Sequence, residues 1–248
     1  NSTGTRQIIL DDTNPVVSFV SPTASHRANR SQDWIFINVT VTETYEANIT
    51  FVLFNEGGIV NSTTYLAGNR TINFTSLADG TYEYNVTVYD SAGNRGNTTD
   101  RQITLDTVNP LINFTIGTAA NNTVMNRTWI FVNVTASDTH EKNITFSLHN
   151  SLHSLVNGTT LSAGSREFNF TSLADGLYYY NVTILDFSEN ENSTETRQIS
   201  LDNTGPTVVI THPQPTAYGF NTSLPLNYSV SDLFSSVDSC WYAVDEGV

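Results

Sequence analysis

Twenty asparagines in the chain stand in the pattern Asn-x-Ser/Thr, with x not proline, which is the acceptor sequence for N-linked sugar. They are 20 of the 28 asparagines in the sequence, whereas the serine and threonine content predicts roughly 7 such patterns by chance. We therefore expect covalent N-glycans on these residues: Asn1, Asn29, Asn38, Asn48, Asn61, Asn69, Asn73, Asn85, Asn97, Asn113, Asn121, Asn126, Asn133, Asn143, Asn157, Asn169, Asn181, Asn192, Asn221 and Asn227.

The residue types that perform catalysis show no recurring arrangement. His149 and His153 are four residues apart, a spacing that brings two ligands together on a helix but not on a strand. Cys240 is the single cysteine, so we expect either a small buried residue or a disulfide with a partner beyond Val248. We expect no enzyme and no required cofactor. The remaining histidines, which also recur in no register, are His26, His140 and His212.

Charge is sparse and strongly acidic, which restricts the partners of the chain. The formal net charge is −14, charged residues make up 14%, and Lys142 is the only lysine. Such a field repels nucleic acid and anionic lipid, and no apolar run approaches the roughly 18 residues of a membrane span. We expect no nucleic acid partner and no membrane contact in this segment, and we expect sugar to supply solubility.

A repeat of domain size organises the sequence. The string RQIILD at residues 6–11 returns as RQITLD at 101–106 and as RQISLD at 197–202, with spacings of 95 and 96 residues. Within a repeat the apolar residues alternate with period two, as in Tyr82, Tyr84, Val86 and Val88, which we assign to a core face. About seven such short strands in one repeat predict an all-β protein made of β-sandwiches.

Part of each repeat resembles a known family. The segment LADGTY at residues 77–82, the following strand and DSAGN at 90–94 resemble the E–F corner, F strand and F–G turn of immunoglobulin-like, Big-type repeats in prokaryotic, notably archaeal, surface proteins. The resemblance implies tandem immunoglobulin-like β-sandwich domains in an extended array. The second repeat has FSEN at 187–190 where the first has SAGN, which weakens any role specific to this turn.

The repeat also sets the expected domains. Residues 12–106 and 107–202 form two immunoglobulin-like domains, residues 1–11 are the last strand of a preceding domain, and residues 203–248 are the first half of a further one. On this interpretation the chain is an excerpt of a longer array.

The sequons fall in register between the repeats and on the outer side of the strands. Six recur in pairs: Asn38 and Asn133, Asn48 and Asn143, Asn61 and Asn157, Asn73 and Asn169, Asn85 and Asn181, and, shifted by one, Asn97 and Asn192. Phe36 lies two residues from Asn38 on the same face, so its ring could lie under the first sugar. Phe131 with Asn133 and Tyr179 with Asn181 repeat this spacing. The alternative to glycosylation is that these residues are ordinary polar residues of the strands, but asparagine is depleted in strands.

Acidic residues form a second candidate site. In this topology the start of the A strand, the B–C loop and the F–G loop meet at one pole of a domain. Several carboxylates there could bind calcium at the domain junctions, or they could simply solvate the turns. The calcium candidates are Asp11, Asp12, Glu43 and Asp90 in one repeat and Asp106, Asp138 and Asp186 in the next, with Glu46 and Glu141 nearby and with Asp202 and Asp232 beginning a third set.

These features favour a structural, densely N-glycosylated extracellular surface or fibre protein made of rigid immunoglobulin-like repeats. The alternative is the spacer or stalk of an adhesin whose ligand-binding domain lies outside this segment. In both cases we expect a location outside the cell or at its surface, with copies of the chain as partners in a filament or surface layer. An exposed, sequon-free patch recurring in each repeat would favour direct self-assembly.

Overall fold

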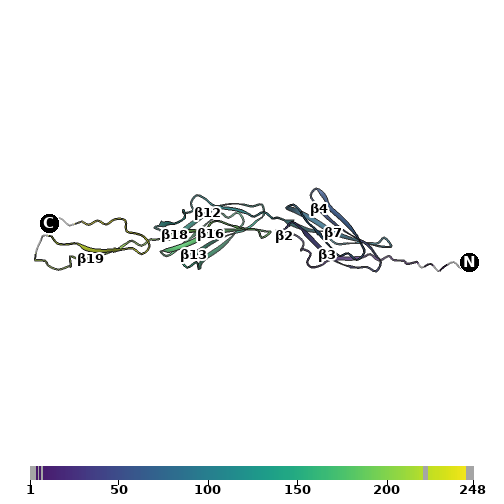
Figure 1. Ribbon diagram of the computed structural model, residues 1–248, viewed down its shortest axis with the longest axis horizontal. Helices are drawn as coiled ribbons and strands as arrows, with labels where there is room; N and C mark the ends of the chain where they lie inside the picture. The colour runs from purple at the N-terminus through teal and green to yellow at the C-terminus, as the bar shows by residue number, and fades with distance from the viewer. Residues whose placement is uncertain (1–3, 5, 7, 220–222, 244–248) are drawn as a thin grey trace. The chain divides into compact units, whose positions relative to one another are not determined.

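The computed structural model describes residue 4, residue 6, residues 8–219 and residues 223–243 (Figure 1). The chain divides into two compact units, Asn1–Asn109 with Asp186–Asn190, and Pro110–Leu185 with Glu191–Val248. The regular elements of the described residues are all β-strands, which confirms the all-β prediction. The described part of the chain also holds no helix long and apolar enough to cross a bilayer.

The first unit is a sandwich of two sheets around one hydrophobic core. One sheet has the strand order β1-β3-β6, and the other has the order β2-β9-β7-β4-β5 with β8 paired to β7. The strands are β1 (Val16–Phe19), β2 (Ala28–Arg30), β3 (Ile35–Thr42), β4 (Glu46–Asn55), β5 (Gly58–Leu66), β6 (Thr71–Phe74), β7 (Gly80–Asp90), β8 (Arg95–Asn97) and β9 (Arg101–Leu105).

The second unit repeats this sandwich with its own core. Its sheets have the orders β10-β12-β15 and β11-β18-β16-β13-β14, with β17 paired to β16. The strands are β10 (Leu111–Phe114), β11 (Thr123–Met125), β12 (Ile130–Ser137), β13 (Glu141–Asn150), β14 (Leu155–Ser162), β15 (Glu167–Phe170), β16 (Gly176–Asp186), β17 (Glu191–Ser193) and β18 (Arg197–Leu201).

The first strand of each sandwich is split between the two sheets. β1 pairs with β3 in antiparallel fashion, whereas β2 pairs with β9 in parallel, with Ala28 opposite Ile103. β10 and β11 divide in the same way between β12 and β18. This split and the short strands β8 and β17 account for nine strands where the sequence pattern predicted about seven.

The alternating pattern predicted from the sequence sets the core. Tyr82, Tyr84, Val86 and Val88 of β7 are all buried, as the alternation predicted. Because successive side chains of a strand point to opposite faces, the residues between them remain on the outer face. Burial of each large apolar side chain stabilises the sandwich by about 1.5–3 kcal/mol. The domains therefore need no disulfide to hold their two sheets together.

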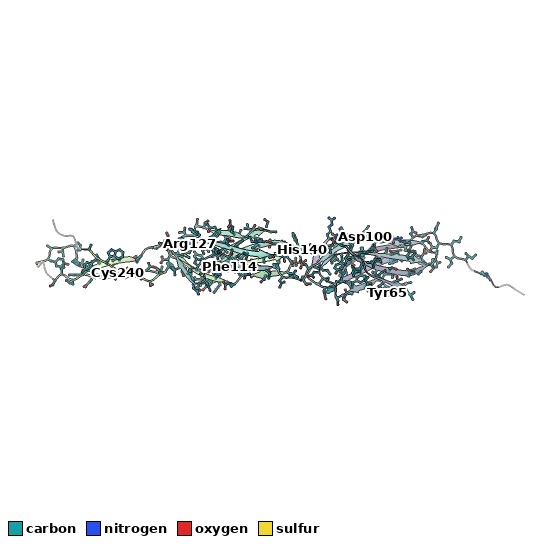
Figure 2. The ribbon with its side chains drawn as sticks, turned by 90° about the horizontal axis from the view of Figure 1, so that it is seen from above. Tyr65, Asp100, Phe114, Arg127, His140 and Cys240 are labelled. Atoms are coloured by element: carbon teal, nitrogen blue, oxygen red, sulfur yellow. The ribbon has the colours of Figure 1, made fainter. Side chains whose placement is uncertain are left out.

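An arginine of the repeated RQI motif closes each core beside two aromatic rings. The Arg101 guanidinium lies 4.5 Å from the ring centroid of Phe19 and donates a 2.7 Å hydrogen bond from Nη1 to the Ala24 carbonyl. The Tyr84 hydroxyl donates to the same carbonyl at 3.3 Å. Arg197, Phe114, Ala119 and Tyr180 repeat the arrangement in the second unit, where Phe114 is labelled in Figure 2.

The Leu-Ala-Asp-Gly motif fixes two neighbouring segments. The hydroxyl of Tyr82 donates to the Ala78 carbonyl at 2.9 Å, which is the tyrosine corner of immunoglobulin-like sandwiches. Asp79 Oδ1 accepts hydrogen bonds from the backbone N–H and the hydroxyl of Thr107, at 3.0 and 3.1 Å. The motif therefore holds the chain where it leaves β9.

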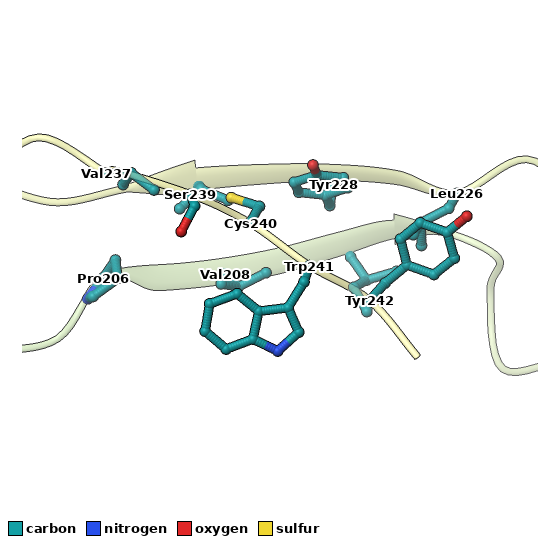
Figure 3. Close-up of a pocket in the computed structure, with 11 residues that line it drawn as sticks. Pro206, Val208, Leu226, Tyr228, Val237, Ser239, Cys240, Trp241 and Tyr242 are labelled. Carbon is teal, nitrogen blue, oxygen red and sulfur yellow. The ribbon is translucent and has the colours of Figure 1, made fainter. Parts of the chain in front are cut away.

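Residues after the second sandwich form a hairpin with an uncovered apolar side. β19 (Thr207–His212) and β20 (Asn227–Ser231) are antiparallel, and their side chains line a cavity of about 290 Å³ together with Cys240 and Trp241 (Figure 3). Cys240 is exposed, so it is not the small buried residue that was one of the two expectations from the sequence. The reason is that no second sheet covers this hairpin among the described residues, which leaves Trp241 88% exposed.

The described residues at the N-terminal end differ from the sequence expectation of a strand. Residues 4, 6 and 8–11 carry no strand, and Ile8 and Leu10 are exposed. Their counterparts in β9 pair with β7 and β2 of the same sandwich. A strand needs such partners for its backbone groups, and no described strand pairs with this segment.

Candidate functional site

The sequons lie mainly on strands, and their asparagines avoid the cores. Of the twenty, Asn1 and Asn221 lie outside the described residues. None of the other eighteen asparagines is buried. Because residues i and i+2 of a strand share a face, a sequon in a strand presents its Asn and its hydroxyl residue on the same side. Most described sequons thus lie on the outer side of the sandwiches, as the expected glycosylation requires.

Two corresponding sequons lie on the edge strand at one end of each larger sheet. Asn61 lies in β5 and Asn157 in β14, and each strand ends the order of its sheet. Each edge also exposes apolar side chains, with Ile59 67% and Leu155 63% exposed. The recurring apolar patch at the edge therefore adjoins a sequon and is not sequon-free.

One recurring sequon pair is not structurally equivalent. Gly96 pairs with Val88 in β8, and Asn192 occupies the matching place in β17 opposite Ile184. A Cβ on Gly96 would lie 1.9 Å from the Pro15 carbonyl oxygen. The one-residue shift between Asn97 and Asn192 therefore places them on opposite faces of their strands. Asn97 is exposed, and Asn192 is half-buried.

The three aromatic rings expected beside sequons all lie half-buried on the outer faces of their strands, and one of them also has a ring partner. Phe36 and Phe131 lie on the outer faces of β3 and β12, half-buried. The third ring, Tyr179, stacks on His153 with the ring centroids 4.4 Å apart. His153 has a positive φ of 58° in the turn after β13, which brings its ring back over the sheet.

Three of the acidic residues in the first repeat lie together. Asp11, Glu43 and Asp90 each offer one carboxylate oxygen, and these oxygens lie within 4.8 Å of one another. Ligand distances of about 2.3–2.6 Å around a calcium ion allow oxygens up to about 5 Å apart. Glu43 follows β3 and Asp90 ends β7, so the strand directions bring both to the pole where β1 begins.

Asn94 orders this acidic group. Its side-chain amide donates to the Asp11 carbonyl at 2.9 Å and to Asp90 Oδ2 at 2.7 Å. Asp90 Oδ1 accepts from the backbone N–H groups of Ala92 and Asn94 at 2.9 and 2.8 Å. Asp90 is only 3% exposed. Burial raises the pKa of Asp90, but these hydrogen bonds outweigh it, so that the pKa lies below its ordinary value and the carboxylate stays charged.

Two other acids of the first repeat do not join the group. Asp12 is exposed and lies outside it. Glu46 binds Arg70, with distances of 2.9 Å from Nη1 to Oε1 and 2.6 Å from Nη2 to Oε2. Spacing along the chain could not distinguish Glu46 from the acids of the group, because its partner Arg70 lies 24 residues away in the sequence.

The corresponding residues of the second repeat show the same hydrogen-bonded acidic arrangement. The amide of Asn190 donates to Asp186 Oδ2 at 2.6 Å and to the Asp106 carbonyl at 2.8 Å, and carboxylate oxygens of the two aspartates lie within 4.8 Å. Asp138 follows β12 as Glu43 follows β3, and its Oδ1 accepts from the His140 N–H at 2.7 Å. Glu141 binds Arg166 as Glu46 binds Arg70.

The turn after β16 therefore makes the same aspartate–asparagine hydrogen bonds as the turn after β7, although the sequence difference weakened the case for a shared role. Asp186 and Asn190 are its essential residues, and the residues between them differ without changing the hydrogen bonds. Glu189 adopts a φ of 70° where Gly93 has 94°. A glutamate in this conformation is unfavourable by roughly 1 kcal/mol, which the two hydrogen bonds from Asn190 offset.

Asp202 begins the third acidic set and has an unusual environment. It is 8% exposed, and its Oδ1 is buried with no hydrogen-bond partner among the described residues. Its backbone N–H donates to the Met125 carbonyl at 3.0 Å, as Asp106 donates to Arg30. An unpartnered buried carboxylate oxygen is costly unless a cation or other donor satisfies it.

Histidines and the cysteine form no comparable group. In the part of the chain that the structure describes, the only clusters of three or more metal-ligating side chains are the acidic ones. His149 lies half-buried within β13, and His153 lies exposed in the turn that follows. The two do not form a paired site.

A family model and several solved structures resemble parts of this chain. Residues 33–107 match the family model described as bacterial Ig-like domain. Among solved structures, fibronectin(III)-like modules of Clostridium thermocellum CbhA are 16% identical over 75% of this chain and 92% of theirs, with a TM-score of 0.42. The FN1–FN3 domains of chicken CNTN1 are 12% identical over 72% of this chain and 69% of theirs, with a TM-score of 0.41.

No curated protein sequence matches the chain. Bacterial Ig-like domains suggest a structural or spacer role, and they are commonly extracellular and non-catalytic. The first sandwich of this chain is thus similar to a bacterial Ig-like domain, and the second repeats its strand order.

Proposed function

We propose that the chain is a structural, densely N-glycosylated segment of an extracellular surface or fibre protein. The observation that carries this proposal is the placement of the sequons: eighteen described acceptor asparagines, most of them on strands, with none buried. In a sandwich about half of the strand positions face the core, so chance placement would bury several of them. A coat of sugar also fits the low content of charged residues, 14%.

The edge strands show what such a coat would do. β5 and β14 have free backbone edges and exposed apolar side chains, which together favour pairing with other chains. Sugar on Asn61 and Asn157 would stand beside these edges and block that pairing. The same coat suits either a fibre or the spacer of an adhesin, because in both cases sugar at the edge strands would act on the surface of each repeat.

Peptide mapping by mass spectrometry tests the proposal. The protein is purified from its native source or from a host that attaches N-glycans, and its intact mass is compared before and after sugar removal. We expect most of the 20 sequons to carry sugar. Occupancy of fewer than about a third would overturn the structural coat.

A second candidate property is calcium binding at the acidic group of Asp11, Glu43 and Asp90. Their oxygens lie within 4.8 Å, and Asp90 is held in its charged form. Three carboxylates with nearby backbone carbonyls resemble the all-oxygen set that calcium prefers. The buried free oxygen of Asp202 at the corresponding position of the third set adds support. Such an ion would tie the B–C and F–G loops to the segment before β1.

Terbium luminescence and calcium titration test this second property. We expect Glu43→Gln to lower the number of ions bound by one, because it removes one ligand without disturbing the Asp90 turn. Asp12→Asn is the matched control and should leave the number unchanged. At about 100 times the dissociation constant, calcium should stabilise the protein by about 2.7 kcal/mol relative to chelator. Equal unfolding midpoints in calcium and in chelator contradict the site.

A further inference from the structure

A phenylalanine on the outer face of each smaller sheet lies directly across from a sequon. Phe36 of β3 is opposite Asn73 of β6, and Phe131 of β12 is opposite Asn169 of β15. Directly opposed residues of an antiparallel pair have Cβ atoms about 5 Å apart, whereas residues i and i+2 of one strand lie about 7 Å apart. The ring is therefore closer to the sequon across the sheet than to the one on its own strand.

The side-chain amides of the two neighbouring sequons differ in their partners. The Asn38 amide donates to the Ser21 carbonyl at 2.9 Å, and the Asn133 amide donates to the Ile116 carbonyl at 3.2 Å. These bonds direct both amides toward the loop before β2 or β11. Asn73 and Asn169 are exposed and form no side-chain hydrogen bond with the described residues. Their amides are free to turn toward the ring.

Neither phenylalanine belongs to the hydrophobic core of its sandwich. Both occupy strand positions whose neighbours, such as Ile35 and Ile37, fill the core, yet their own side chains lie on the outer face and are half-buried. Phe131 Cε1 would lie 3.1 Å from a Cβ on Gly117, so one edge of its ring rests against that turn. The remainder of each ring is an apolar surface beside an exposed acceptor.

We propose that the first sugar on Asn73 packs on the ring of Phe36 and that the first sugar on Asn169 packs on the ring of Phe131. The inference rests on the proposed glycosylation and adds its structural consequence. The C–H face of a pyranose is apolar, and an aromatic face is its natural partner because both lose contact with water. Sugar at these two positions then becomes part of the packed surface of the sandwich, whereas sugar on Asn38 and Asn133 extends over the loops.

A double-mutant cycle in the first unit tests this packing. Thr75→Ala removes the Asn73 sequon and keeps the asparagine, and Phe36→Leu removes the ring while keeping an apolar side chain. The opening equilibrium of the first sandwich is read from hydrogen exchange of core amides such as that of Ile37. We expect the Asn73 sugar to lower the opening constant roughly threefold to tenfold when Phe36 is present and to have no such effect in Phe36→Leu.

Three controls make the outcome unambiguous. Thr40→Ala removes the Asn38 sequon and should show no coupling to Phe36, while Phe36→Tyr should retain the coupling of the native ring. Sugar C–H protons over the ring should resonate upfield in NMR spectra of the native protein. In Phe36→Leu their chemical shifts should return to ordinary values. If mass spectrometry finds Asn73 unmodified, the coat fails at this position and the packing with it. If Asn73 carries sugar without coupling or upfield shift, the packing alone is overturned.

Discussion

The side-chain amide of Asn192 donates a 2.8 Å hydrogen bond to the backbone carbonyl of Pro110. In the first sandwich the same place is taken by Gly96, whose α-carbon lies against the Pro15 carbonyl. The hydroxyl of Thr194, the third residue of the Asn192 sequon, is also engaged, because it accepts from the Val182 N–H at 3.0 Å. Sugar on Asn192 would have to displace the contact with Pro110.

We therefore predict that Asn192 carries little or no sugar in the folded protein, whereas Asn97 carries it. Peptide mapping measures both sites in one sample, and their occupancies should differ severalfold. Asn192→Ala should lower the free energy of unfolding by about 1 kcal/mol, because the Pro110 carbonyl loses its donor. Asn97→Ala is the matched control for the neighbouring exposed position. Equal occupancy at the two sites would contradict the structural role of Asn192.

A second prediction concerns the edge strands β5 and β14. Thr63→Ala combined with Thr159→Ala removes the sequons of Asn61 and Asn157 and leaves both asparagines in place. Because Ile59 and Leu155 then lie beside an unprotected edge, we expect association of chains at lower concentrations than for the native protein.

Sedimentation velocity measures that association. Thr40→Ala combined with Thr135→Ala removes the same number of sequons from β3 and β12, which lie inside their sheets, and it should leave the chain as dispersed as before. If both pairs of substitutions promote association equally, the effect belongs to sugar content in general and not to the edges.

A third prediction concerns Arg101, which contacts Phe19 and the Ala24 carbonyl. Arg101→Lys keeps the charge but loses the planar contact with the ring and the geometry of the hydrogen bond. We expect a loss of about 2 kcal/mol in the free energy of unfolding. Arg95→Lys, at an exposed position, should change it by less than about 0.5 kcal/mol. Denaturant titration followed by tyrosine and tryptophan fluorescence measures both.

A fourth prediction concerns acid stability through Asp90. Its pKa is lower in the folded chain than its ordinary value, because hydrogen bonds from Asn94 and the turn outweigh the effect of burial. Its stabilising contribution is therefore fully present above the unfolded value of about 3.9 and is lost as the pH falls through the lower folded value.

Asp90→Asn should accordingly reduce stability near neutral pH and flatten its decline on the acid side. Unfolding free energies in chelator at about pH 6 and about pH 3 measure the difference, and chelator removes any contribution from a bound cation. Asp12→Asn, on the exposed neighbour of Asp11, serves as the control. An acid-side slope equal to that of the native protein would show that Asp90 does not titrate as described.

Much of the fold follows from local pattern. The alternation of Tyr82, Tyr84, Val86 and Val88 identifies the core face of β7, because each side chain reports the side of the sheet on which it lies. The positions of the sequons on outer faces follow from the same alternation. The one-residue shift between Asn97 and Asn192 could also have been interpreted in this way, since a shift by one reverses the face of a strand.

The remaining features depend on contacts between distant residues. Arg101 meets the Ala24 carbonyl across 77 residues, and Asn94 meets the Asp11 carbonyl across 83. No period or spacing in the sequence identifies such pairs, although the recurrence of Asn94 as Asn190 at the end of unlike turns was a usable signal. The exposed position of Cys240 likewise depends on which strands cover the hairpin, which alignment with the first repeat does not specify.

The split first strand also has a mechanical consequence. β2 and β9 run parallel, with Ala28 opposite Ile103 and Arg30 opposite Leu105. A pull applied to the two ends of the sandwich draws parallel neighbours past each other, so their hydrogen bonds bear load together and do not open one after another. We expect each sandwich to rupture in one high-force step in single-molecule stretching, and Thr104→Pro to lower that force, because the Thr104 N–H lies on the same side of β9 as the Asp106 N–H that donates to Arg30. We expect such units to resist stretching until the hydrogen bonds of the parallel pair break together.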